Sequence, residues 1–447
     1  MSGLGTVGAF GDKGLRLPLT ETFRLAWADP ELRPKILFVL AVFGVYALGV
    51  AIPVPISGVA ASAVMERLQR DIPFFDLLNL MGGGALRRVS IFALGLNPYI
   101  TASIVMQILT TAIPGWKKEL QEGGQYARQQ QNRRTRFLCL FLCIAQSWGL
   151  LHMISAAVPL TFWQYTQIAI FWTAGSMLLL WMGEQVSEKG IGNGVSLMIF
   201  AGIMISFPTQ IHRVATQVAD GVVMWWQVVL LVIIFVATTW GIVMFTIAQR
   251  RIPIQHMRRQ MGTRVVGGHT SYLPFTLNLA GVIPIIFAIS IVYMPMQFAA
   301  MFPEGSTGNQ VLITIGRFMM PTLTSWNGIV ACFVYAAMIF FFTYFWSAIQ
   351  YNVEDISNNL KRAGSFIPGV RPGKQTRDFL DGVISRITLA GASFLAAVAL
   401  LQYVATDITR IQQVGYFFGT SILIMVSVAL ETMRQIEANL LMRQYGG

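Results

Sequence analysis

One short stretch of this sequence has residue types found in nucleotide-binding loops. Residues 369–376 read GVRPGKQT, with two glycines, a proline and Lys374. A phosphate-binding loop needs Ser or Thr directly after its lysine, because that hydroxyl binds Mg²⁺. Gln375 stands there instead, and the glycine spacing also differs. We therefore expect no nucleotide site at this stretch.

The other residues that could do chemistry are scattered along the chain. The four histidines and three cysteines are His152, His212, His256, His269, Cys139, Cys143 and Cys332. The cysteines form no CxxC pair, and the chain has no HExxH or GxSxG motif. Such motifs bring together metal ligands or a nucleophile and its base. We expect no catalytic residues, no metal site and no cofactor.

The elements that must position any site are strongly apolar. The chain has 447 residues, of which 55% are hydrophobic and 12% charged, whereas ordinary soluble domains carry about 25% charged residues. A membrane-spanning helix needs ~20 mainly apolar residues, and uninterrupted runs favour helices over barrel strands. Ten runs predict ten transmembrane helices, at 35–53, 91–113, 137–158, 162–183, 191–207, 226–248, 274–297, 328–350, 387–405 and 412–430.

Basic residues predict the orientation of these helices. Loops on the cytoplasmic side carry an excess of Lys and Arg. With both termini cytoplasmic, seven of the 32 Lys and Arg residues fall outside: Arg67, Arg70, Arg87, Arg88, Arg213, Arg317 and Arg410. We interpret the net charge of +12 partly as attraction to anionic lipids. The rest favours an acidic or nucleic-acid-containing partner.

The centres of the ten predicted spans contain no Asp, Glu, Lys or Arg. Ion-coupled transporters and membrane-embedded hydrolases generally keep ionisable groups at membrane depth. The polar residues available to the interior are Asn97, Thr101, Gln107, Asn278, Thr420 and Ser421. This pattern favours a pore closed by an apolar constriction, and well-packed helices without a pathway are the alternative.

Two of the predicted cytoplasmic connections are long. Residues 249–274 contain β-branched runs and are predicted to form a projecting hairpin with its turn at 267–268. Residues 351–382 have polar helical character and then a rigid Pro- and Gly-rich turn with Arg371 at its tip. The connection 114–136 is predicted to be flexible and basic. Connections this long usually have a function.

Several long motifs then resemble one family. They are GGALRRVSIFALGLNPYITASIVMQIL, GEQVSEKGIGNGVSLMIFAGI, LNLAGVIPIIFAISI, SFIPGVRPGKQT and FFGTSILIMV. In order and spacing they resemble the bacterial SecY family, the channel subunits of the Sec protein translocon. The resemblance covers nearly the whole chain and is weak only at 1–20 and 114–135. It implies an all-α polytopic membrane protein whose ten helices form two inverted-repeat halves, a clamshell around an hourglass pore.

The resemblance also assigns regions of the chain. Residues 1–34 are a cytoplasmic segment, 35–225 the N-terminal half and 226–430 the C-terminal half, with a cytoplasmic tail at 431–447. A plug is implied at about 73–84, formed by Phe74, Phe75, Asp76, Leu77, Leu78, Asn79, Leu80, Met81, Gly82, Gly83 and Gly84. The glycines are expected to act as a hinge, because glycine tolerates unusual backbone angles. An ordinary glycine turn is the alternative reading.

Three further sets of residues match family motifs. A pore ring at the waist of the channel is implied at Leu96, Ile100, Val195, Ile199, Ile286 and Ile424. A lateral gate is implied at Thr101, Gln107 and Asn278, and contacts with a motor or ribosome at Arg250, Arg251 and Arg371. By periodicity alone the ring residues are ordinary core residues. Without the family, the gate residues fit helix–helix contacts equally well, and Arg250-Arg251 could be a positive-inside anchor.

The implied function is passage of unfolded secretory polypeptides through the pore, with lateral release of transmembrane segments into lipid. The implied partners are SecE, SecG, the SecA motor ATPase, the ribosome, signal sequences and unfolded precursors, in a bacterial inner membrane. The protein is not expected to be an enzyme. Two rival hypotheses, a secondary transporter and a membrane-embedded enzyme, lack the charged or catalytic groups that they need. A structural scaffold is a third.

Overall fold

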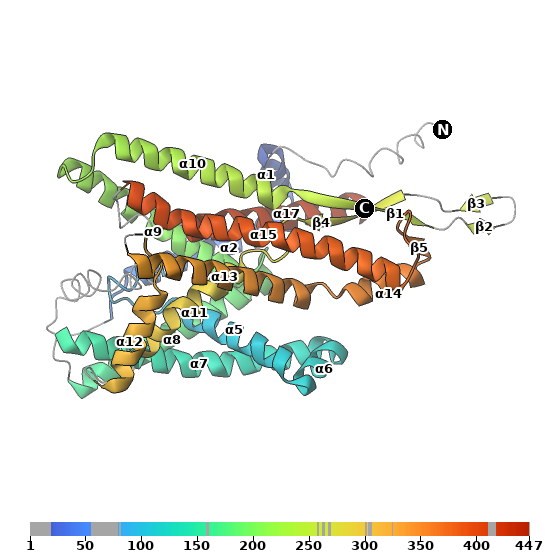
Figure 1. Cartoon of the computed structure of the whole chain (residues 1–447). Helices are drawn as coiled ribbons and strands as arrows, with labels where there is room; N and C mark the ends of the chain where they lie inside the picture. Colours follow the sequence, from blue (N-terminus) through green and yellow to red (C-terminus); the bar gives the residue numbers. More distant parts are fainter. Residues whose placement is uncertain are drawn as a thin grey trace.

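The computed structural model describes residues 19–54, 79, 82–157, 161–256, 259–261, 264–266, 270–299, 302, 306–323, 325–409 and 417–446. Long helices that run roughly along one direction dominate it (Figure 1). Those before residue 250 are α1 (Leu19–Ala28), α2 (Leu32–Ala51), α5 (Asn97–Ala112), α6 (Pro114–Glu122), α7 (Gly124–Ala157), α8 (Phe162–Lys189), α9 (Gly194–Ala219) and α10 (Trp225–Ile247). Those after it are α11 (Ile283–Ala299), α12 (Thr307–Met319), α13 (Trp326–Gln350), α14 (Val353–Arg362), α15 (Lys374–Thr409), the π-helical turn η1 (Phe417–Ser421) and α17 (Ile422–Gly446).

Each of the ten predicted spans coincides with a helix. Seven stretches are long and apolar enough to cross a membrane: Leu32–Ala51, Gly124–His152, Phe162–Lys189, Gly194–Ala219, Trp225–Ile247, Trp326–Arg362 and Lys374–Thr409. The remaining three correspond to the shorter helices α5 and α11 and to η1 with α17. The fold is therefore a polytopic bundle of helices, consistent with ten crossings.

The predicted bounds of two spans were wrong. Residues 91–96 form turns rather than helix, with Gly95 at a φ of +58°, and α5 begins only at Asn97. Residues 274–276 belong to strand β4, and α11 begins only at Ile283. In both places apolar residues are packed without being helical, which hydropathy does not distinguish.

Close approach of backbones fixes the position of α9. Asn193 caps this helix, its Oδ1 accepting the backbone N–H of Ser196 at 3.3 Å. A Cβ at Gly194 would collide with the carbonyl oxygen of Gly183 in α8. Glycine is therefore required where α8 and α9 meet, and this contact sets the depth of the residues that follow it in α9.

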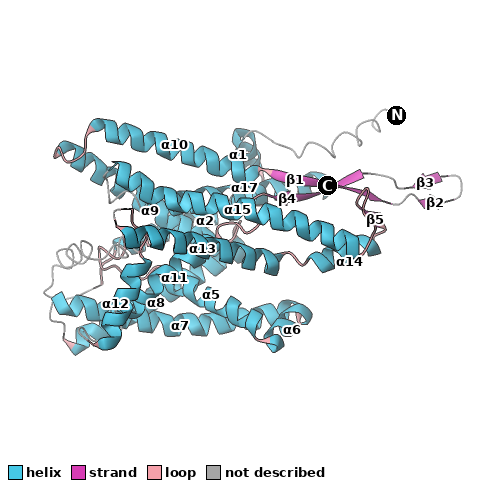
Figure 2. Cartoon of the chain, in the orientation of Figure 1, coloured by secondary structure: helices cyan, strands magenta, loops and turns pink. Residues whose placement is uncertain are grey.

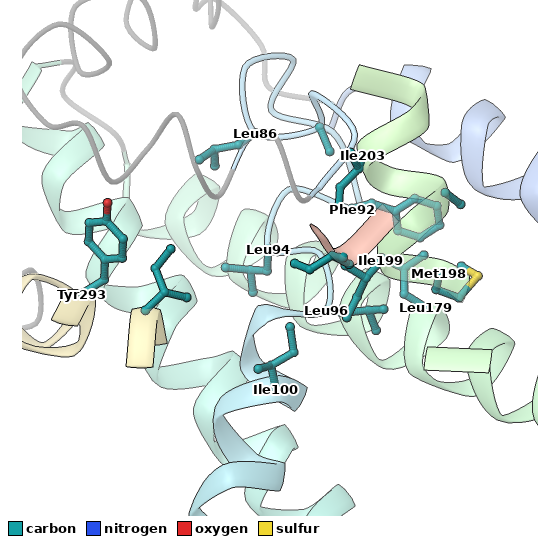
Figure 3. Packing of buried hydrophobic residues seen from close by; sticks show 14 of the residues in the cluster. Leu86, Phe92, Leu94, Leu96, Ile100, Leu179, Met198, Ile199, Ile203 and Tyr293 are labelled. Carbon is teal, nitrogen blue, oxygen red and sulfur yellow. The ribbon is translucent and has the colours of Figure 1, made fainter. Parts of the chain in front are cut away.

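The largest core cluster joins both halves of the sequence. Residues from α2, α5, α7, α8, α9, α11, α13, α15 and α17 contribute to it. Figure 3 shows part of this cluster, with Leu96, Ile100 and Ile199 among its aliphatic side chains and Tyr293 of α11 near its edge. The apolar core is therefore shared by the two sets of helices, although the most extensive helix pairings lie within each set.

A small sheet projects beyond the helices at one end (Figures 1 and 2). Strands β1 (Gln249–His256) and β4 (Thr270–Thr276) pair antiparallel, and β5 (Ser365–Phe366) joins the other edge of β1. Beyond them, β2 (Arg259–Met261) pairs with β3 (Arg264–Val266). The projecting hairpin is confirmed. Met261 pairs with Arg264 where β2 and β3 meet, and the predicted turn at 267–268 lies outside the described residues.

The connection 114–136 is not the flexible segment that we predicted. It is helical, formed by α6 and the first turns of α7, with Gly123 between them. Arg134 of α7 makes an ion pair with Glu119 of α6 at 3.1 Å, and its guanidinium lies over the Trp116 ring. Lys, Glu, Gln, Arg and Ala are good helix formers, so propensity outweighed the polar composition that we read as a loop.

Candidate functional site

The six residues of the predicted ring all lie in or against the largest core cluster. Leu96, Ile100, Ile199 and Ile424 are buried members of it. Val195 and Ile286 are half-buried and pack against it. The side chains thus come from α5 and its N-terminal cap, α9, α11 and α17. The six aliphatic residues predicted from the sequence thus come from four separate helices and lie in or against one apolar cluster.

The local geometry explains how α5 presents two of these residues. The backbone N–H of Ile100 donates to the carbonyl of Leu96 at 3.0 Å. This bond makes Leu96 the residue that begins the helical hydrogen-bonding pattern, and it sets Leu96 and Ile100 one turn apart on the same face. Asn97 lies between them, and Thr101 donates its hydroxyl to the Asn97 carbonyl at 3.1 Å.

The three predicted gate residues are not joined to one another by any hydrogen bond in the described part of the chain. Thr101 is buried, and Gln107 donates to Ser103 Oγ within its own helix at 3.2 Å. Gln107 Oε1 and Asn278 Oδ1 are buried without a hydrogen-bond partner. A buried oxygen without a donor costs on the order of 1–3 kcal/mol. These two oxygens therefore weaken the packed state of the surrounding helices.

One polar contact that the sequence analysis missed does cross between the two sets of helices. Gln146 of α7 donates from Nε2 to Gln297 Oε1 of α11 at 3.4 Å. Both side chains are half-buried. The available signal was an amide inside or at the end of an apolar run, which marks a residue that needs a partner. Sequence alone could not say that these two amides meet.

The predicted plug lies largely outside the described residues. Phe74, Phe75, Asp76, Leu77, Leu78, Leu80 and Met81 are all in that group. Asn79 is buried, and its backbone carbonyl accepts the N–H of Gly84 at 2.7 Å. Its Oδ1 accepts the backbone N–H of Arg87 at 3.0 Å. Asn79 is thus tied to the turn that carries the glycines and the two arginines.

The glycine turn has the backbone that its sequence requires. Gly83 and Gly84 have φ values of +73° and +84°, in the left-handed region that glycine adopts without steric penalty. A Cβ at Gly83 would touch Val50 of α2 and Ile205 of α9. Gly83 therefore also allows the turn to pass closely between two helices.

The three predicted contact arginines lie in the projecting sheet and its neighbouring turn. Arg250 and Arg251 are exposed on β1, opposite Phe275 and Pro274 of β4. Arg371 is exposed in the turn before α15. Its backbone carbonyl accepts the Thr376 hydroxyl at 2.9 Å, and the Gly373 carbonyl accepts the Ser357 hydroxyl at 3.0 Å. The turn that presents Arg371 is thus held at two points.

The structure joins the two long connections into one unit, which the sequence analysis did not foresee. His256 of β1 lies within hydrogen-bond distance of Ser365 of β5, at 2.7 Å, and of Ser271 of β4, at 3.0 Å. Phe275 packs edge-on against Tyr351 at the end of α13, with ring centroids 6.1 Å apart. Arg250, Arg251 and Arg371 are therefore carried by one cross-connected surface.

The geometry offers no group for bond-making chemistry. Among the described residues no three His, Cys, Asp or Glu side chains gather as metal ligands. Cys139 and Cys143 are buried side by side with their sulfur atoms 3.9 Å apart. An apolar body between helices and a basic surface at one end fit transport of a large substrate better than catalysis.

Comparisons with known proteins agree with this arrangement. The family model described as SecY matches residues 90–433. The protein translocase subunit SecY of Staphylococcus carnosus is 38% identical over 440 residues, covering 96% of this chain and 99% of that protein. The same subunit of Thermus thermophilus is 39% identical over 440 residues, covering 96% of this chain and 97% of that protein.

Solved structures show the same fold at low identity. A protein-conducting channel aligns with a TM-score of 0.65 at 19% identity, covering 90% of this chain and 91% of that one. A SecY structure whose plug domain stabilises the closed state aligns equally well, at 18% identity and with the same coverage. Sec61 in a canine ribosome–channel complex aligns with a TM-score of 0.63 at 16% identity, again over 90% and 91%.

The fold and the relatives define a multi-pass membrane protein of the protein-conducting class, a channel and not an enzyme. More closely, the chain belongs to the SecY family of protein translocase subunits.

Proposed function

We propose that translocating polypeptides cross this channel through the ring formed by Leu96, Ile100, Val195, Ile199, Ile286 and Ile424. The observation that supports the proposal is that these six aliphatic residues come from four helices and lie in or against the same apolar cluster. Flexible aliphatic groups can close around any chain and resist wetting when no chain is present. A substrate of no fixed sequence needs such a constriction, because specific polar groups would favour some segments over others.

We propose that the plug at residues 73–84 seals the outer side of this ring. Two observations support this proposal. Asn79 accepts backbone hydrogen bonds from Gly84 and Arg87 in the following turn, and the sequence before Gly82 is amphipathic. A segment this short cannot span a bilayer. It can instead be displaced as a unit when a polypeptide enters, with residues 82–84 as the hinge.

Lateral release of transmembrane segments is proposed to occur where α5 and α7 meet α11 and α13. Two observations support a weakly held seam. The oxygens of Gln107 and Asn278 lack partners, and the side-chain amides of Gln146 and Gln297 share one hydrogen bond of 3.4 Å. Thr101, a buried residue of α5, is proposed to belong to the same seam. An apolar signal sequence can replace this weak contact, because it offers the helices alternative apolar packing.

We further propose that the projecting sheet is cytoplasmic and docks the partner that drives translocation, either a SecA motor or a ribosome. Its arginines suit both, because the planar guanidinium pairs with carboxylates and with phosphates. Both termini are then cytoplasmic and the membrane is the bacterial inner membrane. SecE and SecG are the expected small membrane subunits, with the two halves 35–225 and 226–430 held together by SecE.

Depletion of this protein with complementation tests the proposed function. We expect secretory precursors to accumulate on depletion and to be processed again when the wild-type chain is supplied. Arg371→Glu should assemble in the membrane and fail to restore motor-driven export, because the charge reversal repels an acidic partner surface. Arg371→Lys keeps the charge and should retain part of the activity. Normal precursor processing without the protein, or normal export with Arg371→Glu, would overturn the respective assignments.

A further inference from the structure

A cationic cavity lies between the glycine turn, α2 and α9, away from the apolar ring. Its volume is about 340 Å³, and its lining includes Arg87, Arg88 and Arg213. Asn79, Gly83 and Gln210 also line it. No acidic side chain is among the lining residues that the structure describes. Three arginines thus line one small space at the end of the bundle that we assign to the outside; Arg213 and Arg87 are half-buried and Arg88 is exposed.

Two polar atoms at this cavity are buried and lack partners. Arg213 Nη2 is a donor without an acceptor, and Gln210 Oε1 is an acceptor without a donor. Gln210 as a whole is only 8% exposed. Buried polar groups in folded proteins are nearly always hydrogen-bonded, and like charges held together repel each other. Among the described lining residues, therefore, none supplies these two atoms with both a negative charge and a hydrogen-bond donor.

We propose that this cavity binds a phosphate group that bears a hydroxyl. The anionic oxygens accept from the arginines, whose planar fork pairs with phosphate through two parallel bonds. The hydroxyl donates to Gln210 Oε1, which a fully ionised anion without a donor would leave unpaired. Two sources share this chemistry: the glycerophosphate headgroup of phosphatidylglycerol in the outer leaflet, and protonated inorganic phosphate.

The site has a structural consequence for the channel. Arg87 and Arg88 belong to the turn that holds Asn79, whereas Arg213 and Gln210 belong to α9, the helix of Val195 and Ile199. A bound phosphate joins the turn to α9 by pairing with both. Loss of the phosphate removes this link and leaves the turn held by its backbone hydrogen bonds and its packing against α2 and α9.

Thermal unfolding of the intact protein in nanodiscs tests the proposal. Inorganic phosphate is titrated in phosphatidylcholine nanodiscs, and phosphatidylglycerol replaces part of the lipid in a second arm. We expect a saturable rise in Tm with one or both probes. Arg213→Gln should require at least about tenfold more ligand, since hydrogen bonds to charged groups contribute about 1.5–3 kcal/mol. If Arg213→Gln does not fold, Arg213→Lys is used in its place, because it keeps the positive charge but loses the planar guanidinium.

Arg317→Gln is the matched control, because Arg317 is exposed on α12 at the same end of the bundle and does not line the cavity. It should respond as the wild type does. A rise with phosphate assigns a free anion, and a rise with phosphatidylglycerol assigns a lipid headgroup. The proposal is overturned if neither probe raises Tm. It is equally overturned if the Arg213 variants and wild type rise alike, because phosphate also stabilises proteins non-specifically.

Discussion

Individual side chains in this protein act mainly through size and backbone freedom, not through reactivity. The ring residues are Leu, Ile and Val, and the arginine-bearing turns depend on glycines with positive φ. Val89 also has a positive φ, of +47°, which is unusual for a β-branched residue. Backbone strain is therefore concentrated in the segment that joins the proposed plug to α5.

Gly84 gives a direct test of that strain. Nothing lies within 4 Å of a Cβ built at this position, so only its φ of +84° opposes a side chain. Gly84→Ala should lower the free energy of unfolding by about 1–2 kcal/mol, the cost of a left-handed conformation. Thermal or denaturant unfolding of the purified protein measures this change.

Gly44→Ala is the control for that substitution. Gly44 also has open space around its Cβ position and lies within α2, where Ala is favoured over Gly by about 0.5–1 kcal/mol. The two substitutions should therefore have opposite signs. Equal effects would show that the turn does not require a positive φ.

The sequence could identify the ring residues only through the family motifs. Leu96, Ile100 and Ile199 are of the residue types, and at the spacing, found on any buried helix face. Their periodicity therefore carries no information about a pore. For Gln146 and Gln297 the sequence could not predict which residue each contacts. Each amide was visible in the sequence, but their separation along the chain hides the fact that they meet.

At the scale of elements, the proposed plug predicts a leak when it is removed. Deleting residues 74–82 should allow ions through the resting channel, because the apolar ring alone then forms the seal. Conductance across planar bilayers is the measurement. Replacing the same residues with a Gly-Ser segment of equal length should leak as well, since it restores the connection but not the plug. If the deletion variant shows no ion conductance in the resting state, the segment is a simple connection and not a plug.

The seam between α7 and α11 predicts a small, measurable coupling. Gln146→Leu and Gln297→Leu should each change the free energy of unfolding, and a double-mutant cycle should give a coupling of about 0.6 kcal/mol, typical of hydrogen bonds between membrane helices. Gln107 and Ser103 form the control pair, because their hydrogen bond lies within α5 and does not cross between α7 and α11. A coupling indistinguishable from zero for Gln146 and Gln297 would remove this bond from the account of the seam.

The projecting elements show why hairpins are easier to predict than the strands that pair with them. β-Branched residues and turn signals marked the 249–274 hairpin correctly, because both are local. Strand β5 has two residues, too few for any pattern, and its pairing with Gln255 and His256 is set by tertiary contacts. The helices of 114–136 were missed for a different reason, because their local helix propensity was outweighed in our reading by their polar composition.

At the scale of the whole molecule, charge and apolar surface are separated. The centres of the ten predicted spans contain no Asp, Glu, Lys or Arg, whereas basic residues gather at the projecting sheet and in the cavity beside the glycine turn. α10 exposes Val232, Val236 and Trp240, as a helix in contact with lipid or another membrane subunit does. This separation leaves the interior indifferent to the sequence that passes through it, and it leaves the energy source to a partner.

Cross-linking to a stalled precursor tests the proposed route most directly. The three native cysteines are replaced by alanine, Ile199→Cys is introduced, and a precursor with one cysteine is arrested in transit. We predict a disulfide-linked adduct at Ile199→Cys and none at Val236→Cys, whose side chain is 58% exposed on the outer face of α10. No adduct at Ile199→Cys while the precursor is arrested, or equal yields at both positions, would contradict passage through the ring.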